Sequence, residues 1–293
     1  MSKSNSHFSG MDLNKLISKR KRTFFIGITS IIALFSLIFY MYNHSPEVST
    51  WEVLGVVVFF LLPLILIRNY SSAVTEAAYN IIADNSGWKI YYDDSKFNNI
   101  NKVYQNLIKD FGLLANSGHV DFDNHLEGEI ENYKFIMQDI SWEEPRSSKH
   151  GKRDVSVAEY SLLMIDNTFN INCNILIKKN KMLKWGISKL KRIKIEDKEF
   201  EKYYDAYTDD PATALTVLNP EFIKNLLYYK QVRKNHVEIL ITPATIFVHQ
   251  KSIESEKSFW NIFVNPMELC QKNIENINAK FNILSLISLL NNK

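Results

Sequence analysis

Residues 18–70 read SKRKRTFFIGITSIIALFSLIFYMYNHSPEVSTWEVLGVVVFFLLPLILIRNY, two apolar runs behind a basic cluster. The first run, Phe24 to Tyr42, has nineteen residues without a charge, and eleven of them are Leu, Ile or Phe. As a helix it would extend roughly 28 Å, close to the ~30 Å hydrocarbon core of a bilayer. The second run, Val53 to Ile67, holds thirteen Val, Leu, Ile and Phe residues between Trp51 and Tyr70, which suit a membrane interface. The sequence therefore predicts two transmembrane helices.

A signal peptide or a buried soluble hairpin fits these runs less well. The apolar region of a signal peptide has about 7–15 residues and is followed by small residues at a cleavage site. The first run is longer, and no such site follows it.

The charges beside the runs predict the orientation. Asn43 to Thr50, which connects the runs, has no Lys or Arg and contains Glu47. Basic residues precede the first run: Lys3, Lys15, Lys19, Arg20, Lys21 and Arg22. Because cytoplasmic flanks carry the excess of Lys and Arg, both termini are expected in the cytoplasm. The abundant Lys, Asn and Ile suggest a bacterial genome, so the expected location is the bacterial cytoplasmic (inner) membrane, with a multi-pass topology.

The net charge does not indicate a nucleic-acid binder. The whole chain carries +3, and residues 1–70 carry seven Lys or Arg against three Asp or Glu, which is +4. Residues 71–293 are therefore left with −1, without the basic footprint that DNA binding needs. The expected partners are membrane lipids, an unidentified protein and, through the transmembrane helices, further copies of the chain.

Periodicity after the second run predicts an α+β fold of mostly antiparallel sheet with flanking helices. Ser71 to Ala83 and Lys96 to Leu114 show helical spacing of apolar residues, whereas His119 to Ile140 alternates with period two. Glu143 to Asp154 is polar and predicts a long solvated hairpin loop. The expected division is 1–22 (basic segment), 23–70 (transmembrane hairpin), 71–118 (juxtamembrane helices) and 119–293 (cytoplasmic α+β domain).

Later segments predict three pairs of elements. Ala158 to Ile165 and Phe169 to Lys178 suggest paired strands around a turn at Asp166-Asn167. Asp210 and Pro211 indicate a helix start, and Pro220 indicates another, extending to about Gln231. The remaining predicted elements are a hairpin of Val237–Ile241 with Thr245–His249, a strand at Lys191–Ile195 and an amphipathic helix over Pro266–Leu290.

Residues 194–227, KIEDKEFEKYYDAYTDDPATALTVLNPEFIKNLL, resemble the signature of the bacterial family of unknown function DUF3137. The matching positions are Glu199-Phe200, Tyr207-Thr208-Asp209-Asp210-Pro211 and Leu218-Asn219-Pro220-Glu221-Phe222. Upstream, DFDNHLEGEIENYKF over residues 121–135 resembles the family's strand pair around His-x-x-Glu-Gly, here His125 to Gly128. Asn219 departs from the Thr of many relatives. The resemblance implies two membrane helices before a soluble domain and implies no activity.

One segment has side chains that suit a metal ion. His119, Asp121, Asp123 and His125 alternate along a predicted strand, and with Glu127 and Glu129 they would share one face. Histidine with carboxylate is a ligand set for zinc or manganese. The alternative is the solvent face of an antiparallel strand, whose other face carries Val120, Phe122 and Leu126.

A basic run holds eight positive charges and no acid in seventeen residues: Lys178, Lys179, Lys181, Lys184, Lys189, Lys191, Arg192 and Lys194. In a membrane-anchored domain it could lie on anionic headgroups or bind an anionic ligand, at about 1 kcal/mol per basic residue. The alternative is a solvated face neutralised by the acids that follow: Glu196, Asp197, Glu199, Glu201 and Asp205.

The chain shows no catalytic signature. It has no GxSxG, no paired Cys and His motif and no Gly-rich phosphate loop, and no cofactor is expected. Asp209 and Asp210 are better explained as a capping turn than as a catalytic pair. Cys173 and Cys270 are far apart and are expected to be buried thiols.

The sequence therefore predicts a membrane-anchored cytoplasmic binding or scaffold module without enzymatic activity. Two alternatives are a membrane-tethered metal-dependent hydrolase that uses the His119–Glu129 segment, and a ligand-sensing membrane effector.

Overall fold

The computed structural model describes residues 10–44, 50–92, 97–111, 120–147, 153–180, 190–233, 236–251 and 263–291. The chain divides into two compact units. Unit 1 is Met1–Ser86 with Glu254–Ile277, and unit 2 is Gly87–Ile253 with Asn278–Lys293.

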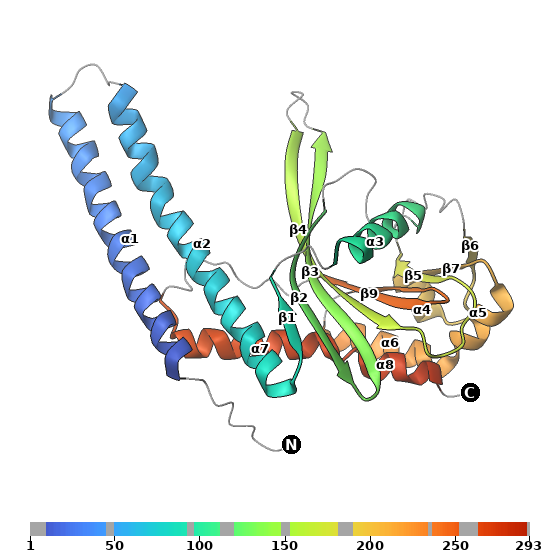
Figure 1. The fold of residues 1–293 in the computed structure, drawn as a ribbon. Coiled ribbons are helices and arrows are strands. Elements are labelled where there is room, and N and C mark those ends of the chain that lie inside the picture. Colours follow the sequence, from blue (N-terminus) through green and yellow to red (C-terminus); the bar gives the residue numbers. More distant parts are fainter. Residues whose placement is uncertain are drawn as a thin grey trace. The chain divides into compact units, whose positions relative to one another are not determined.

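Unit 1 contains a hairpin of two long helices (Figure 1). α1 (Gly10–His44) and α2 (Thr50–Ser86) lie side by side. Leu16, Thr23 and Ser30 of α1 are buried at seven-residue spacing, which is typical of packed helix pairs. At Gly55 of α2, an added Cβ would lie 3.2 Å from Leu37 Cδ2. Small residues at this contact let the two helices approach closely.

The predicted continuation of the second apolar run into a helix is confirmed, because α2 is one helix through Ser86. In the described residues, one helical segment, Asn14–Tyr40, is long and apolar enough to cross a membrane. Core helices and signal sequences can have the same length and composition. The second span therefore remains a prediction.

The first part of α7 (Pro266–Phe281) belongs to unit 1 and packs near the basic ends of the hairpin. Asn273 Nδ2 lies 3.4 Å from Thr75 Oγ1 of α2. Arg20 donates to the Phe263 carbonyl at 3.4 Å, and the rings of Phe24 and Phe263 meet edge to face at 5.8 Å. These contacts fix the segment before and within α7 to the end of the hairpin.

Unit 2 is built on an open antiparallel sheet, and nine of its strands are described. Their order is β1-β2-β3-β4-β9-β8-β5-β7-β6. The strands are β1 (Lys89–Tyr91), β2 (Val120–Ile130), β3 (Tyr133–Ser147), β4 (Arg153–Asp166), β5 (Ile175–Lys179), β6 (Lys191–Ile193), β7 (Tyr204–Thr208), β8 (Val237–Ile241) and β9 (Thr245–Lys251). The expected fold of helices with an antiparallel sheet is confirmed.

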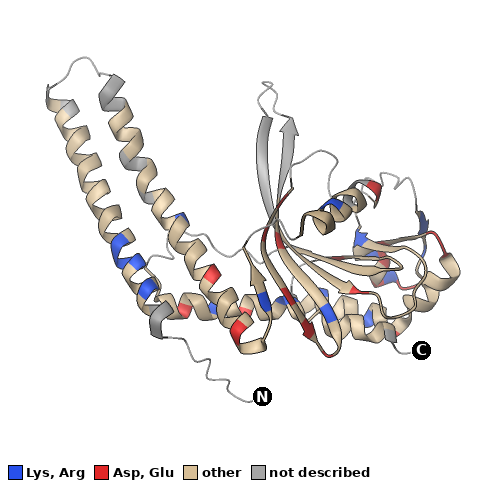
Figure 2. Ribbon diagram, viewed as in Figure 1, with Lys and Arg blue, Asp and Glu red and all other residues tan. Residues whose placement is uncertain are grey.

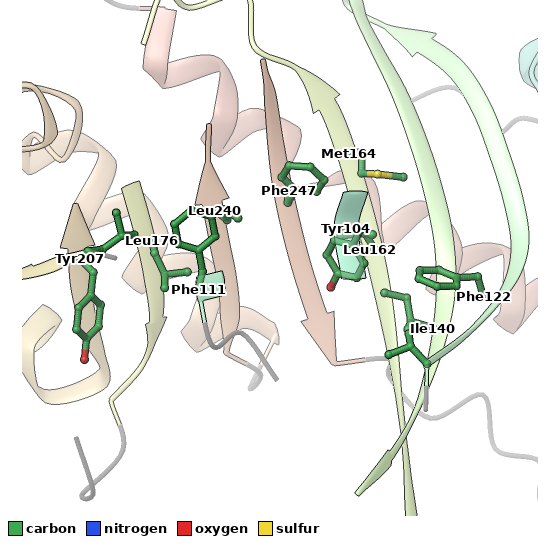
Figure 3. Close-up of a cluster of buried hydrophobic side chains, with 12 residues drawn as sticks. Tyr104, Phe111, Phe122, Ile140, Leu162, Met164, Leu176, Tyr207, Leu240 and Phe247 are labelled. Atoms are coloured by element: carbon green, nitrogen blue, oxygen red, sulfur yellow. The ribbon is translucent and has the colours of Figure 1, made fainter. Parts of the chain in front are cut away.

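One face of the sheet packs against α3 (Asn98–Phe111). Figure 3 shows Tyr104 and Phe111 of α3 among apolar side chains of the strands, including Phe122, Leu162 and Phe247. Tyr104 stacks on Phe247 at 5.9 Å and meets Phe122 edge to face at 6.1 Å. This layer is the apolar core between α3 and the sheet.

The other helices of unit 2 come after β6. They are α4 (Lys198–Tyr203), α5 (Pro211–Val217), α6 (Pro220–Arg233), α8 (Leu284–Ile287) and the 3-10 helix η3 (Ser288–Asn291). Tyr229 of α6 donates to Gln250 of β9 at 2.9 Å, and Gln250 donates to the Lys280 carbonyl at 3.1 Å. The helix starts at Asp210-Pro211 and Pro220, the hairpin of β8 and β9 and the strand at Lys191 are confirmed.

Three local predictions are wrong. Glu143 to Asp154 is not one long loop, because β3 continues to Ser147 and β4 begins at Arg153. The strands after Ala158 do not pair with each other: β4 pairs with β3 and β9, and β5 pairs with β7 and β8. The C-terminal helix ends at Phe281 instead of continuing to Leu290. The first two differences arise because a strand's place in a sheet depends on the strands that pair with it, which can be distant in the sequence. Such pairing outweighs the polarity of a segment and its nearness to the next strand along the chain.

Candidate functional site

The predicted metal segment is divided by a β-bulge. The register of β2 on β3 shifts between Asp123 and Leu126, where Asn124 has a φ of 51°. A register shift changes the face on which the following side chains lie, so the six polar residues do not share one face. Asn124 donates to Asp139 across the bulge at 3.2 Å.

The bulge separates the proposed ligands. Asp121 and Asp123 are exposed, whereas His125 is fully buried and stacks on Phe97 at 4.4 Å with the rings nearly parallel. His119 lies outside the described residues. Within the described ranges, no group of three His, Cys, Asp or Glu side chains could hold a metal ion. Metal binding by this segment stays a prediction.

The basic run is also divided, because its members lie on separate elements. Lys178 and Lys179 end β5, whereas Lys191, Arg192 and Lys194 lie in or beside β6. Lys181, Lys184 and Lys189 lie outside the described residues. The Lys178 ammonium sits 5.2 Å from the centroid of the Tyr207 ring, so it is held on the face that carries Tyr207.

Arg192 is neutralised by two of the acids named above. Its guanidinium contacts Glu201 at 2.5 Å and Asp205 at 2.8 Å. The hydrogen bond to Asp205 is the largest cause that raises the pKa of Arg192. Glu201 also accepts from the Ile195 amide at 2.8 Å. This network ties β6, α4 and β7 together, so Arg192 has a structural role.

The two aspartates of the predicted turn have separate structural roles. Asp210 caps α5 by accepting from the amides of Ala212 and Thr213, and its bond from the Thr213 hydroxyl is the main cause that lowers its pKa. Asp209 accepts from the amide and side chain of Asn174 at 2.9 and 2.6 Å. The interpretation as a capping turn is confirmed.

Sequence reasoning missed a row of polar side chains on the sheet face that packs against α3. The strand register places Gln138 opposite Leu162, Leu162 opposite His249, and His249 opposite Glu238. Residues directly opposite in neighbouring strands lie on the same face. We call Gln138, His249 and Glu238 the polar row. The sequence indicates it only by polar residues at positions of apolar strands that are expected to face inward.

The polar row holds a buried histidine beside a half-buried carboxylate. His249 Nδ1 lies 3.6 Å from Glu238 Oε2, and the His249 ring stacks on Tyr160 at 4.3 Å. In the described part of the chain, His249 Nε2 and both amide atoms of Gln138 are buried without a hydrogen-bond partner. The hydroxyl of Tyr104 is likewise buried without a hydrogen-bond partner among the described residues, and burial raises its pKa strongly.

Such groups normally cost about 1–3 kcal/mol each when they are buried unpaired. A histidine beside a carboxylate can accept or transfer a proton. The polar row therefore supplies several free donors and acceptors inside an otherwise apolar layer. It does not contain a nucleophile or a convergent set of metal ligands among the described residues.

Both cysteines are buried thiols, as predicted. Burial raises the pKa of the Cys270 thiol to about 11. A thiol of this kind is largely protonated at neutral pH and is a poor nucleophile.

The comparisons with known proteins match part of the chain to a family model and give no activity. Residues 161–291 match the family described as "Protein of unknown function (DUF3137)". The match confirms the resemblance noted in the sequence, over the strands from β4 onward and the C-terminal helices.

No curated protein matches the chain. Among solved structures, the chain is similar to the one described as the crystal structure of the mycobacterial trehalose monomycolate transport factor A, TtfA. The identity is 9%, the TM-score is 0.39, and the alignment covers 70% of this chain and 95% of that one. Similarity this low supports no inference about function.

Proposed function

We propose that the protein is a membrane-anchored binding module, in which α1 and α2 both span the membrane and unit 2 is the cytoplasmic binding domain. The observation that carries this proposal is the exposed apolar surface of the hairpin. On α1 the exposed large apolar residues are Phe24, Phe25, Ile28, Ile31, Ile32, Phe35, Ile38, Phe39 and Tyr40. On α2 they are Leu54, Val57, Val58, Leu61, Leu62, Leu64 and Ile65.

Water is an unfavourable environment for this surface. Exposed apolar side chains of this size forgo about 1.5–3 kcal/mol each relative to burial, and soluble monomers rarely carry large contiguous apolar patches. A bilayer would cover the exposed residues of both helices at once. The exposed apolar residues of α2 are therefore the observation that favours a second span.

The polar groups of α1 suit a lipid environment. Thr29 donates to the carbonyls of Phe25 and Ile26 at 3.0 Å, and Ser36 donates to the Ile32 carbonyl at 2.9 Å. These hydroxyls are satisfied within their own helix, which hydrocarbon surroundings require.

The basic residues support the cytoplasmic orientation. Figure 2 shows Lys and Arg gathered towards one end of α1. Because Lys and Arg concentrate on the cytoplasmic side, this end is expected inside the cell. With two spans, unit 2 is on the same side.

Thiol labelling of intact cells tests this arrangement. Ser49→Cys lies in the connecting segment, and Lys194→Cys lies on an exposed position of unit 2. A membrane-impermeant maleimide is expected to label Ser49→Cys in intact cells and Lys194→Cys only after lysis. The buried native thiols give the background in the unsubstituted protein. Labelling of Lys194→Cys in intact cells would contradict the two-span anchor.

A further inference from the structure

A second cluster of lysines surrounds a half-buried tyrosine, Tyr203, in unit 2. Lys202 and Tyr203 end α4, Lys230 lies in the last turn of α6, Lys179 ends β5, and His236 precedes β8. We call these five residues the Lys–Tyr cluster. Only Lys179 belongs to the basic run that the sequence shows.

The ring of Tyr203 is the centre of the cluster. The Lys230 ammonium lies 3.0 Å from the ring centroid, and the Lys202 ammonium lies 5.1 Å from it. The ring of His236 is 6.2 Å away. The distance between the two ammonium groups is therefore shorter than the Debye length, which is about 10 Å at 0.1 M salt, so salt screens their repulsion only a little.

Backbone contacts hold Lys179 beside the same site. Lys179 pairs with Tyr204 in the sheet register. The next residue, Asn180, donates its amide to the Tyr203 carbonyl at 2.9 Å and its side chain to the Glu201 carbonyl at 2.7 Å. The end of β5 and the end of α4 are thus fixed to each other.

Unlike Arg192, the three lysines of the cluster are not neutralised by carboxylates of the described residues. In the part of the chain that the structure describes, Lys179, Lys202 and Lys230 form no ion pair with a carboxylate. A helix C-terminus favours a cation and accounts for the positions of Lys202 in α4 and Lys230 in α6, but not for that of Lys179 at the end of β5.

The electrostatic effects on the neighbouring rings agree with an excess of positive charge. Hydrogen bonding and the charge of Lys202, followed by Lys230, lower the pKa of the Tyr203 hydroxyl. Burial, Lys179 and Lys230 lower the pKa of His236, against an opposing effect of Glu238. An anion in this place would relieve the repulsion.

Two buried polar atoms belong to Tyr204 and His236, which are next to the cluster or part of it. Tyr204 is fully buried, and its ring meets that of His236 edge to face at 5.5 Å. Within the described ranges, neither the Tyr204 hydroxyl nor His236 Nδ1 has a hydrogen-bond partner of ordinary geometry. The cluster therefore combines three cations with a ring nitrogen of His236 that is unpaired among the described residues.

We propose that the Lys–Tyr cluster binds a phosphate group, carried either by a phospholipid headgroup or by free phosphate. Three ammonium groups match the double charge of a phosphomonoester, and lysine binds phosphate as a point charge. The Tyr203 hydroxyl adds a neutral donor. This inference rests on the proposed binding function and names the ligand class of unit 2.

Calorimetric titration of the full-length protein in phosphatidylcholine nanodiscs tests the proposal, with inorganic phosphate as the probe. The test variant is Lys202→Gln/Lys230→Gln. The control variant is Lys198→Gln/Lys224→Gln, which removes the same charge from exposed positions of the same two helices. Saturable binding is expected in the wild type and in the control, and about tenfold weaker or undetectable binding is expected in the test variant.

A second arm identifies the source of the phosphate. If a headgroup occupies the cluster, nanodiscs that contain phosphatidic acid abolish the phosphate titration in the wild type. If free phosphate is the ligand, the titration is the same in both discs. Absence of saturable binding in phosphatidylcholine discs, or an equal loss in both variants, would overturn the proposal. Neither result affects the anchor, because thiol labelling measures the topology independently.

Discussion

Gly128 of β2 is predicted to be intolerant of any side chain because of Trp88. A Cβ added at Gly128 would lie 2.5 Å from Trp88 Cδ1 and 2.6 Å from Trp88 Cγ. The indole cannot retreat easily, since it packs against Phe135 at 4.9 Å and Phe281 at 5.0 Å. Gly128 has no positive φ, so the expected cost comes from the clash and not from the backbone.

Gly128→Ala should therefore destabilise unit 2 by roughly 2–4 kcal/mol. Overpacking contributes about 1–3 kcal/mol, and partial loss of the two aromatic contacts, each worth about 0.5–1.5 kcal/mol, adds about 1 kcal/mol. For a domain of this size, at about 2–4 °C per kcal/mol, the midpoint of thermal unfolding should fall by roughly 4–16 °C. Near-ultraviolet circular dichroism of the full-length protein in detergent measures this midpoint.

A double-mutant cycle tests the reasoning itself. Trp88→Ala removes the clashing ring, so Gly128→Ala should cost little in that background, and the two changes should be strongly non-additive. If Gly128→Ala lowers the midpoint equally with and without the indole, the explanation by collision is refuted.

Three further predictions concern a cap, a carboxylate and a thiol. Asn219 caps α6 by accepting from the Phe222 amide at 2.9 Å. Thermal unfolding should show a loss of stability of about 1 kcal/mol in Asn219→Ala and only a fraction of that in Asn219→Thr, because threonine can also cap a helix. Equal losses of stability in the two variants would contradict the role of Asn219 as a cap. The hydrogen bonds that Asp210 accepts from Thr213 and Ala212 lower its pKa in the folded protein. The charged carboxylate of Asp210 therefore stabilises the fold at a pH above the ordinary carboxyl pKa. This stabilisation is lost as the pH falls through the folded pKa. Unfolding midpoints measured from pH 6 to about pH 3 should thus fall less in Asp210→Asn than in the wild type; parallel curves would argue against this. With its pKa raised to about 11, Cys270 should react with iodoacetamide at neutral pH much more slowly in the native protein than after denaturation, as peptide mass spectrometry can measure; equal rates would contradict its burial.

Local signals predicted several elements correctly. Asp210 with Pro211, and Pro220 by itself, mark helix starts through capping and the fixed φ of proline, which depend only on neighbouring residues. The hairpin of β8 with β9 was likewise predicted from a local pattern, and its turn lies at Thr242-Pro243-Ala244. Thr242 closes it by accepting from and donating to Thr245.

Features that depend on distant partners could not be predicted. Glu143 to Ser147 is polar, yet it forms a strand because β4 supplies its backbone partners. β5 lies between β7 and β8, and no residue near β5 encodes that position. The bulge at Asn124 also reverses the alternation on which the metal hypothesis depended.

The candidate binding sites also depend on residues that are distant in the sequence, so they could be predicted only in part. The basic run was visible as a run of lysines, but Arg192 proved to be committed to Glu201 and Asp205. The Lys–Tyr cluster unites Lys179, Lys202 and Lys230, which are far apart in the sequence. Its existence follows from the sheet topology and not from any motif.

The two ends of the sheet bear on how the protein behaves at high density. Both terminal strands, β1 and β6, are three residues long, and each contains a lysine. Short, charged terminal strands offer little backbone for a strand of another molecule to join. Molecules tethered as proposed above would diffuse in two dimensions and meet often, and these ends would allow such crowding without the growth of intermolecular β-structure.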